Sequence, residues 1–165
     1  MIRSKWLSLA TILVAAALIL SLPARAEDPT TKSLEEYLKA ARGDVMERRE
    51  SALKTFIKLD ETQSKTFSQL KKEYDAELKT IGDARATLLR EYAKVYKTIT
   101  PAQAKDMGAR SLKLDEDRNA LRRKYFDVMS EKVSPLAAGQ FLQLERQFET
   151  MMDFKVQSVV PLAGE

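Results

Sequence analysis

Three short segments, each an apolar residue followed by a small polar one, divide the chain into long stretches with few helix breakers. They are Leu59-Asp60, Ile99-Thr100 and Val133-Ser134. In each segment the polar side chain can accept a hydrogen bond from a free amide in the first turn of a helix. The apolar residue before it can pack against that first turn. The pattern therefore predicts three helix starts.

The residues after these segments complete the pattern. Gln63 and Gln103 occupy the third helical position, where a side-chain amide can bond back to the N–H of the cap residue. Pro101 and Pro135 occupy the first helical position, where the missing N–H has no helical partner to lose. Ser33, with an acidic residue three positions later, predicts the start of an earlier helix in the same way.

Between these starts, apolar residues recur every three or four positions, which predicts long helices over residues 61–98, 102–132 and 136–160. A first helix over residues 33–58 should bend or break at Gly43-Asp44. No stretch alternates as a β-strand does, so we predict an all-α fold. Because short links favour antiparallel neighbours, its centre would be an elongated antiparallel hairpin of two long helices, flanked by the N- and C-terminal helices. A fold so thin also predicts a dimer.

Residues 1–26 have the pattern of a cleavable secretory signal peptide. Arg3 and Lys5 precede a continuous apolar run over residues 7–22, and Ala24-Arg25-Ala26 fits the small-residue cleavage pattern. The alternative is an uncleaved membrane anchor, but the run is shorter than the roughly 20 residues that a span needs. We therefore predict an exported, periplasmic protein with no lasting membrane span.

The predicted mature chain has three parts, which are a flexible leader over residues 27–32, one helical domain over 33–162 and a tail over 163–165. The signal segment carries three of the 28 basic residues and none of the 24 acidic ones. Its removal leaves 25 basic against 24 acidic residues, so the net charge falls from +4 to about +1. A nearly balanced charge and export both argue against nucleic acid as a partner.

The residue types argue against catalysis. The chain has no His and no Cys, so the usual general base near neutral pH and the usual thiol nucleophile are absent. Adjacent carboxylates such as Glu35 and Glu36 point apart on a helix. Without His or Cys, the carboxylates alone would favour Ca²⁺ or Mg²⁺ in loops that this sequence does not show. We predict a protein that is not an enzyme and needs no metal or cofactor.

Two segments are candidates for binding. The run Arg118–Lys124 is basic and follows Asp115–Asp117, so we expect surface pairing within the helix, or else contact with an acidic partner or anionic lipid headgroups. The last helix carries apolar residues over a broad face, and adaptable Met beside aromatic rings suits varied apolar partners. The residues that we expect to bind polypeptide are Phe141, Leu144, Phe148, Met151, Met152 and Phe154. The alternative is that they pack against the long hairpin or a second subunit. Gly82 and Gly108 predict close approaches between helices.

The helix starts resemble the Leu-Thr-x-x-Gln motif of the Spy/CpxP group of periplasmic proteins. The matching segments are Leu59-Asp60-Glu61-Thr62-Gln63 and Ile99-Thr100-Pro101-Ala102-Gln103. Val133-Ser134-Pro135 and the helix after it resemble the C-terminal segment of related exported proteins. The resemblance covers about residues 34–162. The first copy departs from the motif because Asp60 replaces Thr, and the near-neutral mature charge differs from the strongly basic chaperone members.

The resemblance implies a periplasmic, helical and often dimeric protein connected with envelope stress. Members of the group act as ATP-independent chaperones, as adaptors that restrain a sensor kinase, or as metal-responsive sensors. We therefore predict a chaperone-like protein that binds non-native polypeptides. The alternative is a regulatory or structural helical adaptor that docks on one specific envelope partner, such as a sensor protein.

Overall fold

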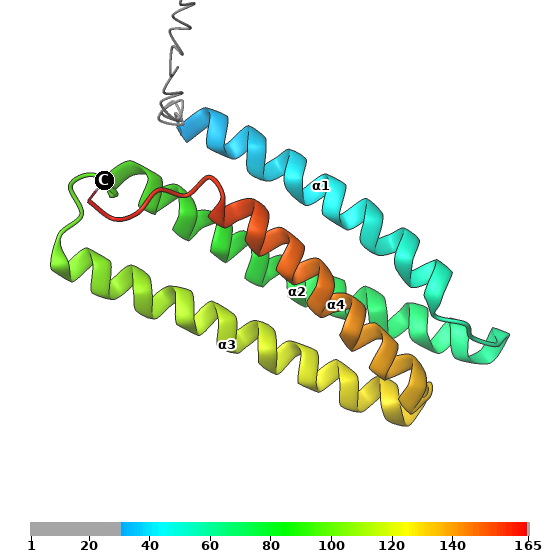
Figure 1. Ribbon diagram of the computed structural model, residues 1–165. Coiled ribbons are helices and arrows are strands. Elements are labelled where there is room, and N and C mark those ends of the chain that lie inside the picture. The colour runs from blue at the N-terminus through cyan, green and yellow to red at the C-terminus, as the bar shows by residue number, and fades with distance from the viewer. Residues whose placement is uncertain (1–30, 165) are drawn as a thin grey trace, which may run out of the picture.

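The computed structural model describes residues 31–164, with side chains from residue 34 onward. This part of the chain forms four helices and no strand. The helices are α1 (Thr31–Phe56), α2 (Glu61–Val95), α3 (Pro101–Lys132) and α4 (Pro135–Gln157). The predicted all-α class is confirmed. Consecutive helices run in opposite directions and give a bundle that is elongated along the helix axes (Figure 1).

The N-caps of α2, α3 and α4 are Asp60, Thr100 and Ser134. The Gln63 N–H donates to Asp60 Oδ1 at 2.8 Å, and the Gln63 side chain accepts from the Asp60 N–H at 3.2 Å. Thr100 and Gln103 make the same reciprocal pair, at 3.3 and 3.0 Å. Ser134 accepts from the third residue of α4 at 3.1 Å. Each helix start therefore satisfies first-turn amides through bonds within three residues of its cap.

The first helix differs from its prediction in two respects. α1 begins at Thr31, so Ser33 is inside it and is not its N-cap. The helix also continues through Gly43 without a break, and Asp44 accepts from Arg48 one turn later at 2.8 Å. The cause is tertiary packing, because an inward-facing stripe of α1 is buried on both sides of Gly43. That burial outweighs the cost of about 1 kcal/mol for one glycine in a helix.

The predicted signal peptide, residues 1–26, and most of the leader lie outside the described residues. Within residues 31–164, no helix combines the length and the apolar character needed to cross a membrane.

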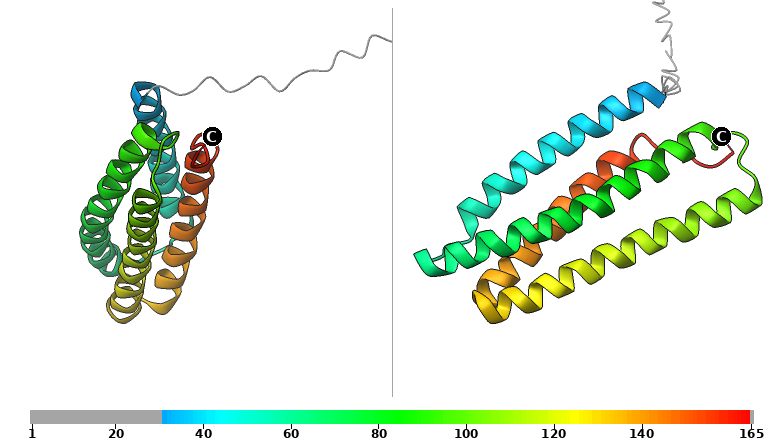
Figure 2. Two further views of the ribbon diagram at one scale, coloured as in Figure 1. Left: turned by 90° about the vertical axis from the view of Figure 1, so that its left-hand side faces the viewer. Right: turned by 180° about the vertical axis from the view of Figure 1, so that it is seen from behind.

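The helices pack in the order α2, α3, α4, α1, while α1 makes little contact with α2 (Figure 2). The apolar core lies toward the end of the bundle where α1 leads into α2 and α3 leads into α4. Its aromatic centre is Tyr74, whose ring meets Phe141 edge-on at 5.0 Å and Tyr125 at 5.3 Å between centroids. Leu59 and Val133, the apolar residues before two of the caps, pack against this core.

At the opposite end the C-terminal segment folds back onto α2. The Tyr92 hydroxyl donates to the carbonyl of Pro161 at 2.8 Å, and the Gly164 N–H donates to the carbonyl of Tyr96 at 2.7 Å. The predicted tail is thus attached to the bundle through Gly164.

Removing the caps tests this account of the helix starts. Asp60→Ala and Thr100→Ala should each lower the free energy of unfolding by about 1 kcal/mol, because each leaves first-turn amides without an acceptor. Urea unfolding followed by circular dichroism measures the change. Ser68→Ala, an exposed replacement within α2, is the control and should change stability by less than about 0.5 kcal/mol. Equal effects in all three variants would contradict the prediction.

Candidate functional site

A cleft of about 680 Å³ lies between α1 and α2, closed on its inner side by residues of α3 and α4. Its volume is within the roughly 300–1,000 Å³ typical of sites for small ligands. The large apolar side chains that line it are Leu38, Val45, Met46, Leu78, Leu89, Phe148, Met152 and Val156. We call it the α1–α2 cleft.

The cleft exists because α1 packs on α4 and meets α2 mainly through charged side chains. Four ion pairs join the two helices, and two of these pairs involve residues of the polar network below. They are Glu35–Arg90 at 3.7 Å, Arg42–Asp83 at 3.1 Å, Arg49–Asp75 at 2.8 Å and Glu50–Lys71 at 2.7 Å. The α1 partners at 35, 42 and 49 recur every seven residues, so they lie on one side of the helix and face α2. The pairs near the start of α1 are half-exposed, whereas Arg49 is buried.

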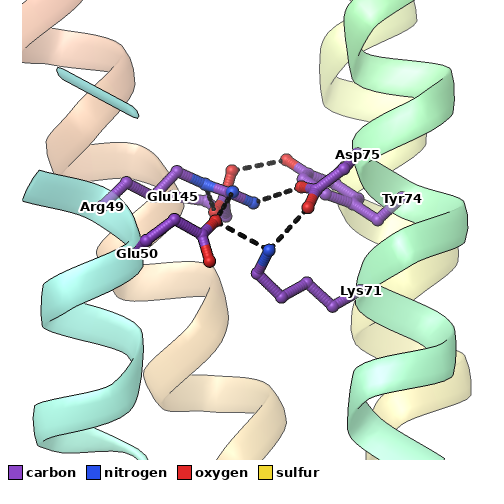
Figure 3. A network of polar contacts seen from close by, with 6 residues as sticks. All are labelled: Arg49, Glu50, Lys71, Tyr74, Asp75 and Glu145. Carbon is purple, nitrogen blue, oxygen red and sulfur yellow. Dashed lines mark hydrogen bonds and ion pairs between the residues drawn. The ribbon is translucent and has the colours of Figure 1, made fainter. Parts of the chain in front are cut away.

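A buried polar network closes the cleft at its inner end (Figure 3). Arg49 is 2% exposed and Glu145 is 5% exposed. The Arg49 Nε–H donates to Glu145 Oε1 at 2.5 Å, and its Nη2 donates to Asp75 at 2.8 Å. The Tyr74 hydroxyl donates to the other Glu145 oxygen at 2.9 Å. Lys71 joins the network from α2 by bonding Asp75 at 2.6 Å. The network therefore connects α1, α2 and α4 at one level of the bundle.

Burial changes the proton affinities in this network. Burial raises the pKa of Glu145 above its usual value, although Arg49 and the Tyr74 hydroxyl oppose the shift. Burial alone would lower the pKa of Arg49, but Glu145 and Asp75 together outweigh it and raise that pKa. Burial, followed by the charge of Glu145, also raises the pKa of Tyr74. Tyr74 therefore remains a hydrogen-bond donor to Glu145 and Arg49 remains charged at neutral pH.

A second charged group lies along the inner wall of the cleft. Arg118 and Arg122 of α3 both pair with Glu149 of α4, and Arg85 of α2 pairs with Asp153 of α4. Burial lowers the pKa of Arg118, and the positive charge of Arg85 adds to the effect. Burial likewise lowers the pKa of Arg122. The Arg118 Nε–H is buried and has no hydrogen-bond partner among the described residues.

These contacts correct the prediction for the basic run in α3. Arg118 and Arg122 were expected to form pairs within their own helix on the surface. Instead both side chains are only 13% exposed and bond to another helix. The reason is that α3 turns this side toward α4, which supplies Glu149 as a shared acceptor. Lys124, by contrast, lies near the surface and pairs with Glu77 of α2 at 2.6 Å.

The structure divides the six residues predicted to bind polypeptide. Phe141 and Leu144 are core residues, 2% and 8% exposed, and offer no surface to a partner. Phe148 and Met152 line the α1–α2 cleft. Met151 is half-buried outside it, and Phe154 is 75% exposed. Sequence reasoning missed the contributions of α1 and α2. The available signal was the seven-residue spacing of charges from residue 35 to residue 49.

The two glycines predicted to permit close helix approach also differ from expectation. A Cβ on Gly82 would lie 3.2 Å from Nη2 of Arg42, so this glycine makes room for the guanidinium that bridges to Asp83. A Cβ on Gly108 would meet no atom of residues 34–164 within 4 Å, so the described helices make no close approach there.

The cleft combines an apolar interior with charged side chains, which suits noncovalent binding of a partly apolar ligand. Within residues 34–164, no group of three or more acidic side chains is placed to share a metal ion.

No protein-family model, curated protein or solved structure matches this chain. The resemblance to the Spy/CpxP group therefore stays a prediction from the helix-start motifs.

Breaking the buried ion pair on one side tests its structural role. Arg49→Met should lower the free energy of unfolding by about 3–5 kcal/mol at pH 7, because Glu145 would stay buried without its cation. The double variant Arg49→Met/Glu145→Leu should recover much of this loss. Arg123→Met, which replaces an exposed arginine of α3, is the control and should change stability by less than about 0.5 kcal/mol.

The loss in Arg49→Met should also depend on pH. The folded protein holds a proton on Glu145 more tightly than the unfolded chain does, because burial raises that pKa. Stability of the variant should therefore rise as the pH falls from 7 toward the usual pKa of glutamate, near 4.5. Chemical unfolding at several pH values measures this. A deficit that is unchanged over that range would show that the charge of Glu145 is not its cause.

The two helical glycines form a matched test of the Arg42 contact. Gly108→Ala should raise the free energy of unfolding by roughly 1 kcal/mol, because alanine favours the helix and the new methyl group meets open space. Gly82→Ala should gain less, because Arg42 must move away from the methyl group. Thermal unfolding of both variants gives the comparison. An equal or larger gain at Gly82 would contradict the contact.

Proposed function

We propose that the protein is a periplasmic, ATP-independent chaperone-like protein that binds apolar segments of non-native polypeptides. The observation that carries the proposal is the α1–α2 cleft. Ion pairs join the two helices there, and apolar side chains line the open space between them. Phe148 and Met152, both predicted from the sequence to contact polypeptide, contribute to this lining. A soft thioether beside an aromatic ring can adapt to side chains of different shape.

The bridging ion pairs support reversible binding. Glu35–Arg90 and Arg42–Asp83 are half-exposed, with side chains 41–51% accessible, and pairs that water screens contribute little to stability. At their level α1 packs on α4, and its Ala41 and Val45 are buried. A small movement of α1 on α4 would therefore widen the cleft at low cost. A bound segment could enter and leave in this way without an energy source.

The alternative function is an adaptor that docks on one specific envelope partner. It is favoured by the nearly balanced charge of the predicted mature chain, which does not promote capture of varied charged clients. An adaptor would form a single saturable complex and leave unrelated clients unaffected. The predicted dimer is compatible with either function.

Aggregation of reduced insulin, followed by light scattering, tests the chaperone proposal. The chain has no Cys, so the reductant leaves its covalent structure unchanged. A stoichiometric amount of the protein should suppress scattering. Leu78→Asp places a charge in the cleft and should weaken suppression several-fold, whereas Leu112→Asp, at a 67% exposed position outside the cleft, should not. Circular dichroism verifies that both variants fold. If the unchanged protein suppresses nothing, the chaperone proposal is wrong and the adaptor is favoured.

A further inference from the structure

We propose that the α1–α2 cleft binds a single-chain anionic amphiphile, a long-chain fatty acid, with the carboxylate on Arg118 and the acyl chain along the apolar lining. This ligand differs in class from the polypeptides proposed above. Both proposals place a ligand in the same cleft, but fatty-acid binding is measured apart from suppression of aggregation, so the failure of one test does not decide the other.

The ion pairs across the cleft favour a narrow ligand. Glu35–Arg90 and Arg42–Asp83 join α1 to α2 over it, with 3.7 and 3.1 Å between the paired atoms. A helix with side chains is about 10 Å across, so it could not lie between α1 and α2 without breaking both pairs. A single acyl chain has the width of one methylene group and can lie beneath them. The cleft volume of about 680 Å³ suits a molecule of this size.

The interior of the cleft offers an apolar path. Leu38 from α1, Leu78 and Leu89 from α2, and Phe148 and Met152 from α4 all line it. These side chains come from three helices and so surround the path on more than one side. Each methylene group that leaves water along the path adds to affinity.

The charges of the cleft favour an anionic head. Its lining includes eight Lys or Arg residues and five Asp or Glu residues, a surplus of three positive charges. On the inner wall, the carboxylates within ion-pair distance of the Arg85, Arg118 and Arg122 guanidinium groups, among the described residues, are Glu149 and Asp153. A third carboxylate would balance this group.

Arg118 is the centre of the proposed head site. Its side chain is 13% exposed, and its buried Nε–H has no acceptor among the described residues. A guanidinium that is largely removed from water gains more from a carboxylate than an exposed one does. Burial also lowers its pKa, as expected for a cation that lacks full compensation by anions. A fatty-acid carboxylate that met the exposed part of the guanidinium would add the negative charge that this group lacks.

Displacement of a fluorescent fatty acid, cis-parinarate, tests the proposal on the purified protein. Parinarate should bind saturably at one molecule per chain, and palmitate should displace it. Hexadecanol has the same chain without the charge and should displace it roughly tenfold to hundredfold less well, the effect of one charge-assisted hydrogen bond. Acetate, the head alone, should displace nothing. Absence of saturable parinarate binding would overturn the proposal.

Two variants and a control locate the site. Arg118→Gln should remove most of the preference for palmitate over hexadecanol while leaving the affinity for hexadecanol unchanged, because only the head contact is lost. Met152→Asp should weaken both ligands, because the charge lies on the acyl path. Arg123→Gln, at an exposed position of the same helix as Arg118, should change neither. Circular dichroism accompanies each variant. A preference for palmitate that survives in folded Arg118→Gln would overturn the head site. If that variant does not fold, unchanged binding in Met152→Asp would overturn the acyl path.

Discussion

The ion pair between Arg49 and Glu145 is the constraint around which the helices are arranged. Its two charges are almost completely removed from water, so each must have a partner in a fixed position. Arg49 meets this need by bonding α4 through Glu145 and α2 through Asp75. Tyr74 supplies the remaining donor to Glu145. These bonds therefore fix the distance between α1, α2 and α4 and the rotation of each helix at this level. Apolar contacts alone are less directional and would fix both less closely.

The bundle has a different character on each side of this network. On one side, toward the end of α1, aromatic and aliphatic side chains from all four helices form a continuous core. On the other side α1 packs on α4, and the bonds that join it to α2 among the described residues are ion pairs. The seven-residue spacing of the α1 charges keeps this arrangement over two heptads. The cleft between α1 and α2 thus follows from the packing of α1 on α4 rather than on α2.

Features set by neighbouring residues could be predicted from the sequence, whereas features set by distant partners could not. The caps at Asp60, Thr100 and Ser134 depend on the next three residues, so their pattern is visible in the chain. The break expected at Gly43 was wrong because packing on α4 overrides a weak local preference. The apolar spacing of α4 showed which residues tend to be buried. It could not show that Phe141 meets the core while Met152 meets a cleft, because α1, α2 and α3 decide that.

The cleft is more readily understood as a place for a ligand than as a seam of the bundle. Two helices that meet only to complete a bundle normally bury apolar side chains against each other, because that contact supplies most of their stability. Here the apolar side chains of α1 and α2 that line the cleft border open space, and ion pairs join the two helices. A molecule that fills it would supply the absent contacts and stabilise the folded state by binding to it. The charges at the mouth keep the two helices in register without closing the space. The buried network fixes the helices, and the half-exposed pairs join α1 to α2 over the cleft. A ligand could therefore enter the cleft without disturbing the apolar core.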